Sequence, residues 1–418
     1  DAELLLVNTC GFIRPAVEEA VDEILRLAEY KESNPAKKLV VTGCLVQRYG
    51  KELQQELPEV DLFVCIDDEE RIVNLIGGLD RESSIVLQRP SRFILNSTMP
   101  RRLSTPPFRS TMPRRLSTPP FRSYLKITEG CNNRCTYCMI PSIRGDLRSR
   151  PIMDLVTEAR VLGEAGVREL TLIAQDLTAY GSDLGPETNL VTLLKALLTE
   201  TDIPWLRLLY LYPVSTGTEL LQLMADHPRI LPYLDIPFQH TSDAVLKKMG
   251  RRYGQQDLEH LIRKIRSYLP DCALRTTMLI GFPGETEQDV VELLDCLQRW
   301  QLDHVGVFPF EAEDGSVAAG FADKVNEEEK QLRFQRVMEL QAVISKSRLQ
   351  QYVGREEQVL VEGLSRESDL LLEGRTRYQA PDIDGCVYIN EGTANPGDIA
   401  KVRITEAHIY DLVGGIID

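Results

Sequence analysis

The chain has 418 residues, of which 43% are hydrophobic and 27% charged, a composition typical of a soluble globular protein with two or three domains. The net charge of −15 argues against a protein wrapped in nucleic acid, and the lack of a long apolar run excludes a predicted membrane span. Nine cysteines are few for a disulfide framework at this length, so we expect reduced thiols in the cytoplasm, some of them held by metal.

The first stretch, residues 1–88, is predicted to be an α/β domain. It opens in mid-strand with DAELLLVNTC and without Met, so we expect that the natural N-terminus is missing. The expected elements are, in chain order, a strand over 4–10, an amphipathic helix over 15–30, and strands over 38–44 and 61–66. Cys10 and Cys44 fall at the carboxyl ends of the first two strands, where open α/β sheets bind ligands.

Residues 89–122 are predicted to be a linker. The sequence STMPRRLSTPPFR at 97–109 recurs without change at 110–122. One perfect repeat is not the pattern of a solenoid, which needs at least three units. We interpret it as a tandem duplication in a tolerant, proline-rich loop, or as an artefact of the sequence.

Residues 123–349 alternate between strand and helix patterns about six times. The predicted strands are YLKITEG, ELTLIAQ, WLRLLYL, YLDIPFQ, LRTTMLIG and HVGVFPF. Repeated β-α units imply a parallel sheet, and six of them suggest an open, partial version of the eight-unit barrel. Functional residues are then expected at the carboxyl ends of the strands.

Residues 350–418 consist of short strand-like runs bounded by Gly, Pro and Asp, which predict a small antiparallel β-barrel. The expected fold class is therefore multi-domain α/β plus β. It combines an N-terminal α/β domain, a partial (β/α)6 barrel and a C-terminal β-barrel.

Three cysteines with the spacing C-x3-C-x2-C follow the first strand of the partial barrel, namely Cys131, Cys135 and Cys138 in EGCNNRCTYC. A structural zinc site needs a fourth Cys or His, and a ferredoxin supplies a fourth Cys, yet neither follows here. Three buried thiols are the simple alternative, but this spacing on a loop is a metal-ligand pattern. Three thiolates can hold three corners of a 4Fe–4S cluster and leave the fourth iron open for a substrate or cofactor.

The loop CNNRCTYC after the first strand of a partial barrel resembles the radical S-adenosylmethionine (SAM) superfamily. The resemblance implies that the open iron binds the amino and carboxylate groups of SAM. It also implies that the reduced cluster cleaves SAM to methionine and a 5′-deoxyadenosyl radical. In this interpretation, SAM binds the iron that a fourth cysteine would otherwise ligate.

The same resemblance implies further contacts with SAM at successive strand ends. The residues concerned are Tyr137 near the adenine, Gln175 and Gln239 after the second and fourth strands, Arg275 at the carboxylate, and Ile280 and Gly281 along the adenine. The alternatives are satisfied core amides for Gln175 and Gln239 and a structural ion pair for Arg275. We interpret His240 as structural.

The whole chain is similar to the methylthiotransferases, which insert a methylthio group into unactivated C–H bonds. The resemblance implies an N-terminal domain with its own three-cysteine 4Fe–4S cluster that carries the sulfur, the radical SAM barrel, and a C-terminal barrel called TRAM. VNTCGF with Cys10 and VTGCLVQRYG with Cys44 match two ligands of the N-terminal cluster, and the third ligand lies upstream of this sequence. Cys65 is interpreted as a buried strand cysteine rather than a replacement ligand.

Two branches of the family differ in substrate. The RimO-like branch modifies the β-carbon of an aspartate in ribosomal protein S-twelve, and the MiaB-like branch modifies an isopentenyl-adenosine of tRNA. The stretches LIAQDLTAYGSDLG, GCLVQRYGKEL and LLLEGRTRYQAPDIDGCVYI resemble the former. Residues 351–418, with six Lys/Arg and thirteen Asp/Glu, suit a basic protein better than RNA. Residues 97–150 contain eleven Lys/Arg and two Asp/Glu, and this positive charge allows a secondary contact with ribosomal RNA.

These observations predict a transferase that uses two 4Fe–4S clusters and SAM and modifies ribosomal protein S-twelve, free or on the small subunit. We expect an electron donor such as flavodoxin or ferredoxin, and no membrane partner. The alternatives are the tRNA-modifying enzyme and a non-catalytic iron–sulfur or RNA-binding scaffold. The intact SAM-site pattern argues against a scaffold.

Overall fold

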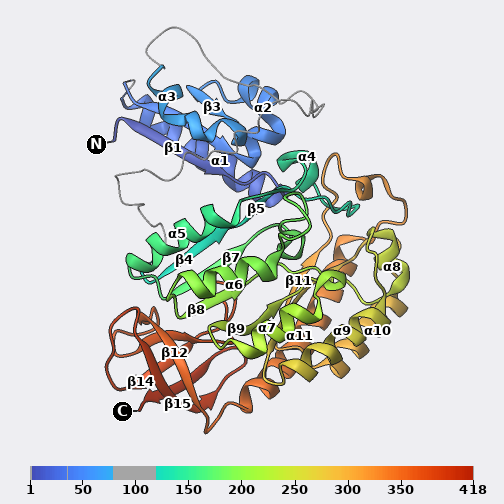
Figure 1. Ribbon diagram of the computed structural model, residues 1–418. Coiled ribbons are helices and arrows are strands. Elements are labelled where there is room, and N and C mark those ends of the chain that lie inside the picture. The colour runs from blue at the N-terminus through green and yellow to red at the C-terminus, as the bar shows by residue number, and fades with distance from the viewer. Residues whose placement is uncertain (1, 35, 79–118, 418) are drawn as a thin grey trace. The chain divides into compact units, whose positions relative to one another are not determined.

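This computed structural model describes residues 2–34, 36–78 and 119–417 (Figure 1). They form two compact units. The first, here called the cysteine unit, contains the described residues up to 78 together with Gly130–Asp146 and Glu311–Ala319. The second, the barrel unit, contains the other described residues from 119 onward. Most of the predicted linker, including nearly all of the duplication, lies outside the described residues.

The cysteine unit is built on three parallel strands in the order β1-β2-β3, which are β1 (Leu4–Thr9), β2 (Lys38–Gly43) and β3 (Leu62–Val64). Its helical elements are α1 (Arg14–Glu32), α2 (Cys44–Glu56), η1 (Ile66–Arg71), α3 (Ile72–Ile76) and α4 (Ile140–Arg144). Pro15 stands in the first turn of α1, and Ala20, Ile24 and Ala28 recur every four residues. This spacing buries one face of the helix in the core of the unit.

The barrel unit contains the predicted six-stranded parallel sheet, in the order β11-β10-β9-β8-β7-β4 (Figure 1). The strands are β4 (Arg122–Lys126), β7 (Glu169–Ile173), β8 (Trp205–Leu208), β9 (Ile230–Asp235), β10 (Ala273–Ile280) and β11 (His304–Pro309). Between β4 and β7 in the sequence, the chain also forms a short antiparallel pair of strands, β5 (Thr128–Glu129) and β6 (Arg148–Ser149). The partial (β/α)6 barrel is thereby confirmed.

A helix follows each strand of this sheet. The helices are α5 (Ile152–Glu164), α6 (Leu190–Glu200), α7 (Thr218–Asp226), α8 (Asp243–Lys248), α9 (Gln255–Tyr268), α10 (Glu287–Trp300) and α11 (Glu327–Gln350). Along β10, Leu274, Met278 and Ile280 are buried in the main hydrophobic core with residues of these helices. Arg275, Thr277 and Leu279 point to the other face of the strand and are only partly buried.

The C-terminal strands form the predicted closed barrel, in the order β12-β13-β14-β16-β15. They are β12 (Glu356–Leu364), β13 (Leu372–Thr376), β14 (Val387–Glu391), β15 (Ile399–Ala407) and β16 (Leu412–Ile416). The pairing of β14 with β16 is parallel, whereas the other pairings of the barrel are antiparallel, so the expected all-antiparallel arrangement is corrected here. β15 and β16 are joined by a turn in which His408 N donates to Asp411 O.

A buried ion network fastens the C-terminal barrel to the beginnings of the sheet strands. Glu169, the first residue of β7, accepts from Arg207 Nε at 2.5 Å and from Arg375 Nη2 of β13 at 2.6 Å. Arg375 also contacts Glu362 at 2.8 Å. Burial by itself would raise the pKa of the Glu169 carboxyl, but the charges of Arg375 and Arg207 lower this pKa to about 2.

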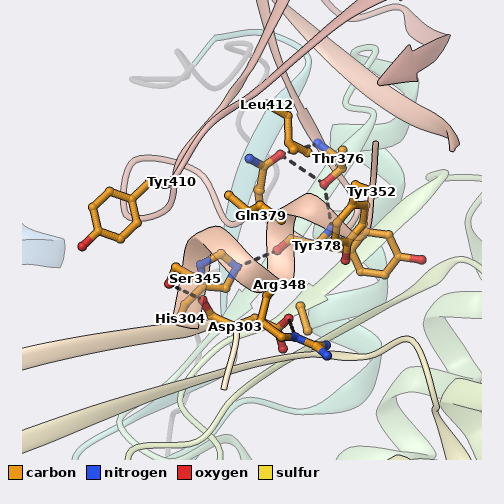
Figure 2. A pocket seen from close by; sticks show the side chains of 12 residues that line it. Asp303, His304, Ser345, Arg348, Tyr352, Thr376, Tyr378, Gln379, Tyr410 and Leu412 are labelled. Carbon is orange, nitrogen blue, oxygen red and sulfur yellow. Dashed lines mark hydrogen bonds and ion pairs between the residues drawn. The ribbon is translucent and has the colours of Figure 1, made fainter. Parts of the chain in front are cut away.

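A small cavity of about 10 Å³ lies where the beginnings of β10 and β11 meet the C-terminal barrel (Figure 2). Ala273 and His304 line it from the strands, and Tyr378 and Gln379 line it from the barrel. His304 Nε2 lies 3.0 Å from the carbonyl oxygen of Tyr378. A space of this size holds about one water molecule, so it does not accommodate a nucleoside cofactor.

Among the helices in the described ranges, none combines the length and the apolar character that crossing a lipid bilayer requires.

Replacing Glu169 by Gln should destabilise the barrel unit by roughly 3–5 kcal/mol, because it leaves the buried guanidinium groups of Arg207 and Arg375 without their shared counter-charge. Since the pKa of Glu169 is lower in the folded state, its stabilisation is complete above about pH 4.5 and is lost as the pH falls toward 2. Urea unfolding and hydrogen exchange over residues 353–417 measure both effects. The control, Glu356→Gln, removes a solvent-exposed pairing with Arg403 and should leave the free energy of unfolding nearly unchanged.

Candidate active site

The two cysteines of the N-terminal domain leave neighbouring strands at one edge. The register of β1 and β2 pairs Thr9 with Gly43, so Cys10 and Cys44 directly follow paired residues. Gly43 has φ +105°, and a Cβ there would lie 2.3 Å from Thr9 O, so only glycine permits this approach. Cys44 is also the first residue of α2. Cys10 is exposed and Cys44 is buried.

Cys65 follows β3 and is 2% exposed, within the hydrophobic core of the cysteine unit. Its burial among apolar side chains agrees with its interpretation as a core cysteine.

The loop with the three cysteines is closed by its own backbone. Cys131 N donates to Gly145 O at 3.1 Å, and Cys138 N donates to Cys135 O at 3.1 Å. Ile140 N donates to Cys138 Sγ at 3.4 Å. Hydrogen bonds from the backbone to cysteine sulfur are a common feature of iron–sulfur ligation, because they stabilise the thiolate and tune the cluster. The donor set and this N–H···S bond fit a cluster with three protein ligands.

Within the described residues, no three Cys, His, Asp or Glu side chains are gathered as they are around a single metal ion. The five cysteine ligands therefore stay a prediction, which rests on their spacing, on the strand register and on the bonds of the loop.

The expected SAM contacts at the carboxyl ends of the sheet strands come from β7, β9 and β10. Gln175 lies two residues after β7 and is exposed. Gln239 follows β9 with φ +72°, and it bridges to β10 through bonds to Thr277 O and from Leu279 N at 2.8 and 2.7 Å. A non-glycine residue in this left-handed region is strained, and such strain gathers at functional sites.

Ile280 and Gly281 stand at the end of β10, beside Gln239 in the sheet order. Gly281 has φ +70°, and its N–H donates to Glu285 Oε2 at 2.8 Å. A Cβ at Gly281 would lie 2.4 Å from Cγ of Lys330, whose amine is bound to Phe310 O. The backbone turn at Gly281 therefore requires glycine. Tyr137, the remaining expected contact, is partly buried in the cysteine unit.

The expected contact of Arg275 with the SAM carboxylate is corrected by the placement of this residue. Arg275 is the third residue of β10, five residues before the carboxyl end, a distance of roughly 16 Å along a strand. Its Nη1 donates to Asp384 of the C-terminal barrel at 2.8 Å, and its Nε lies 3.6 Å from Asp235. Arg275 thus belongs to the structural ion pair that was its alternative interpretation. The sequence conceals this, because Asp384 is more than a hundred residues away.

His240 is fully buried, as expected for a structural histidine. Its Nδ1 accepts from Ser242 N at 2.9 Å, and its Nε2 lies 3.4 Å from Glu285. Glu285 also binds Arg333 at 2.8 Å. Burial by itself would raise the pKa of Glu285, but His240, Arg333 and the Gly281 amide hold it below its usual range. This network holds the turn at Gly281 in place, because its central carboxylate, Glu285, accepts from Gly281 N.

Two further residues at this edge were not identified from the sequence. Tyr210, two residues after β8, has φ +66°, and its side chain is substantially exposed, as is that of Phe308 near the end of β11. Tyr210 N donates to Asp235 Oδ2, and burial raises the pKa of the Asp235 carboxyl to about 6. The run LLYLYP contains no glycine that would announce the left-handed backbone, so only the structure reveals it.

The fold and the site define a radical SAM enzyme. Residues 125–297 match the model of the Radical SAM superfamily, residues 353–417 match the TRAM domain, and residues 1–65 match an uncharacterized protein family, UPF0004. The sheet also resembles that of TsrM, a radical SAM methyltransferase from Kitasatospora setae solved with cobalamin and a 4Fe–4S cluster bound. That match has a TM-score of 0.53 and 17% identity, and it covers 73% of this chain and 63% of the other, so it shows the fold alone.

The chain belongs to the family of the ribosomal protein uS12 methylthiotransferases named RimO. It is 53% identical to the RimO protein of Desulfotalea psychrophila and 45% identical to that of Geobacter sulfurreducens, in each case over 100% of this chain and 91% of the relative. The corresponding protein of Myxococcus xanthus is 44% identical, over 100% of this chain and 84% of the relative. The chain is therefore a transferase whose cofactors are 4Fe–4S clusters and SAM.

Replacing Gly281 by Ala should weaken SAM binding about tenfold, because the new methyl group meets Lys330 and the backbone is held in a region that costs alanine energy. A SAM titration of the anaerobically reconstituted protein measures the affinity. The matched control is Gly320→Ala, where a Cβ would have no heavy atom within 4 Å. Equal affinities for the two variants would remove Gly281 from the SAM site.

Proposed function

We propose that this chain attaches a methylthio group to the β-carbon of an aspartate in ribosomal protein uS12, in the cytoplasm, with electrons from a flavodoxin or ferredoxin. The observation that carries the proposal is the identity of 44–53% to RimO proteins over the full length of this chain. The cysteine loop, the strand-end residues and the acidic C-terminal barrel support it. When bound, the clusters and SAM supply hydrogen abstraction and the sulfur that is transferred.

In this proposal Cys131, Cys135 and Cys138 hold the cluster that binds SAM, and Cys10 and Cys44 contribute to the second cluster. Both sets lie in the cysteine unit. Cys44 follows β2 directly and is the first residue of α2, so the backbone fixes its position. In the other set, the bond from Ile140 N to Cys138 Sγ fits a ligand sulfur of a cluster.

Gln175, Gln239, Ile280 and Gly281 are the proposed SAM contacts of the barrel unit, and Tyr137 is that of the cysteine unit. The strained backbone of Gln239 and the glycine turn at Gly281 fix this edge before any ligand arrives. Such rigidity favours catalysis by positioning, which is what a radical reaction requires. Arg275 is left out of this set, because its guanidinium is held by Asp384.

The surface of the C-terminal barrel favours a basic protein as substrate. The side chains of Glu367, Asp369, Glu391 and Glu406 are exposed. Leu370, which directly follows Asp369 in the connection between β12 and β13, is 91% exposed. The basic residues of the barrel are largely engaged, since Arg375 is buried with Glu169 and Arg403 pairs with Glu356. An acidic face with an apolar tip suits a basic protein partner.

The tRNA-modifying alternative loses support at the basic stretch. In its described part, Arg122 pairs with Asp382, Lys126 with Glu129, Arg134 with Asp146 and Arg150 with Glu158. Cations that already neutralise carboxylates release fewer counterions on binding phosphate, so they contribute less to RNA affinity.

Replacing Cys135 by Ala should abolish SAM cleavage while the C-terminal barrel stays folded. Replacing Cys44 by Ala should instead leave the formation of 5′-deoxyadenosine within about twofold and abolish methylthio transfer, because only the second cluster is lost. Chromatography of the nucleoside products and iron analysis separate the two cases. SAM cleavage that survives Cys135→Ala would sink the assignment of this cysteine, and a scaffold would show no cleavage in the unchanged protein.

The full-length protein, given SAM, a reductant and sulfide, should modify the aspartate-bearing loop peptide of uS12 and leave isopentenylated tRNA unchanged. Mass spectrometry of both substrates in separate tubes measures this. An adduct on the tRNA alone would contradict the proposal and return the basic stretch to the role of an RNA contact. The affinity for the peptide should fall as salt is added, because the contact between the acidic barrel and a basic peptide is screened.

A further inference from the structure

The helix that follows the three-cysteine loop reaches the cysteine at the beginning of α2. Arg144, the last residue of α4, donates from Nη2 to Sγ of Cys44 at 3.0 Å. Cys44 is 7% exposed and belongs to the proposed second cluster. A guanidinium from one cysteine loop therefore touches a sulfur of the other set of cysteines, and all of these residues lie in the cysteine unit.

The position of Arg144 is fixed on both sides. Met139 and Ile143, which precede it in the chain, are buried in one cluster with Cys44 and pack against Phe12 of the Cys10 loop. On its other side, Gly145 has φ +75° and accepts from the N–H of Cys131 at 3.1 Å. The contact with Cys44 thus follows from the closure of the three-cysteine loop on itself.

A second set of bonds ties the same loops together through residues 311–319. Arg48 of α2 has a side chain that is 6% exposed, and its Nη1 donates to Gly11 O at 2.9 Å and to Glu313 Oε2 at 3.0 Å. Arg48 Nη2 donates to Asp314 O at 2.9 Å. Farther along this segment, Ala318 N donates to Thr136 O of the three-cysteine loop at 2.9 Å. The Cys10 loop and the three-cysteine loop are therefore bonded to one segment.

We propose that Arg144 is a positioning residue that ties the SAM-cluster loop to the second cluster through its bond to Cys44 and sets the reduction potential of that cluster. The bond is charge-assisted, and a cation that donates to a ligand sulfur stabilises the more negative, reduced state of an iron–sulfur cluster. The ion pair of Arg48 with Glu313 holds the Cys10 loop in place, because Arg48 also donates to the carbonyl oxygen of Gly11. This inference rests on the proposed role of Cys44 as a ligand of the second cluster.

The test compares Arg144→Met and Arg144→Lys in the full-length protein. To observe the second cluster alone, each change is combined with Cys131→Ala, Cys135→Ala and Cys138→Ala, and the midpoint potential is measured by titration with electron paramagnetic resonance. Arg144→Met should shift the midpoint potential to more negative values. Arg144→Lys should give a smaller shift in the same direction, because lysine keeps the positive charge but lacks the planar set of guanidinium donors. The matched control is Arg71→Met in the same unit, which removes an exposed pairing with Asp68 and should shift nothing.

In the protein with all its cysteines, Arg144→Met should lower methylthio transfer by about tenfold to a hundredfold and leave 5′-deoxyadenosine formation within about twofold. An unchanged midpoint potential in Arg144→Met, with normal iron content, would overturn the proposal. So would an equal loss of both products with a changed circular dichroism spectrum, since that marks a purely structural residue.

Failure of the proposed function gives a different result. If the unchanged protein does not modify the uS12 peptide but Arg144→Met still shifts the potential, the positioning role stands and the substrate assignment falls. If the peptide is modified and Arg144→Met behaves as the unchanged protein does, the function stands and the positioning role falls.

Discussion

Parallel pairing of strands brings their carboxyl ends to one edge, and both units of this protein depend on that constraint. In the cysteine unit, the register that pairs Thr9 with Gly43 delivers Cys10 and Cys44 together. In the barrel unit, the same geometry brings the ends of β7, β8, β9 and β10 side by side. This convergence is accompanied by strained backbone, because Tyr210 and Gln239 adopt left-handed conformations where the chain leaves the sheet.

The opposite edge of the sheet serves stability. The C-terminal barrel covers the beginnings of the strands, and buried charges join the two through Glu169 with Arg375 and through Asp384 with Arg275. Each carboxylate there is shared between cations or hydrogen-bond donors, which offsets the cost of burying it. The division of labour is that of barrel enzymes generally, with chemistry at the carboxyl ends and structural contacts at the beginnings.

The three-cysteine loop belongs to the same compact unit as the N-terminal domain, although the chain reaches it only after the first strand of the barrel. The segment 311–319, which follows the last strand, joins it there. Apolar contacts of Met139 and Ile143 with Cys44, and the ion pair of Arg48 with Glu313, explain this grouping. A reaction that uses two clusters needs their loops held in one frame, and these contacts provide it.

The sequence by itself determined the six β-α units, the closed C-terminal barrel and the cysteine pattern, because hydrophobic periodicity and ligand spacing are local properties of the chain. The cysteine ligands and the SAM contacts at Gln239 and Gly281 stay predictions that the structure makes geometrically reasonable. Only the tertiary structure decided that Arg275 pairs with Asp384, that β14 and β16 run parallel, and that Arg144 reaches Cys44. Each of these depends on partners between 24 and 109 positions away along the chain, and no local pattern records a partner at such a distance.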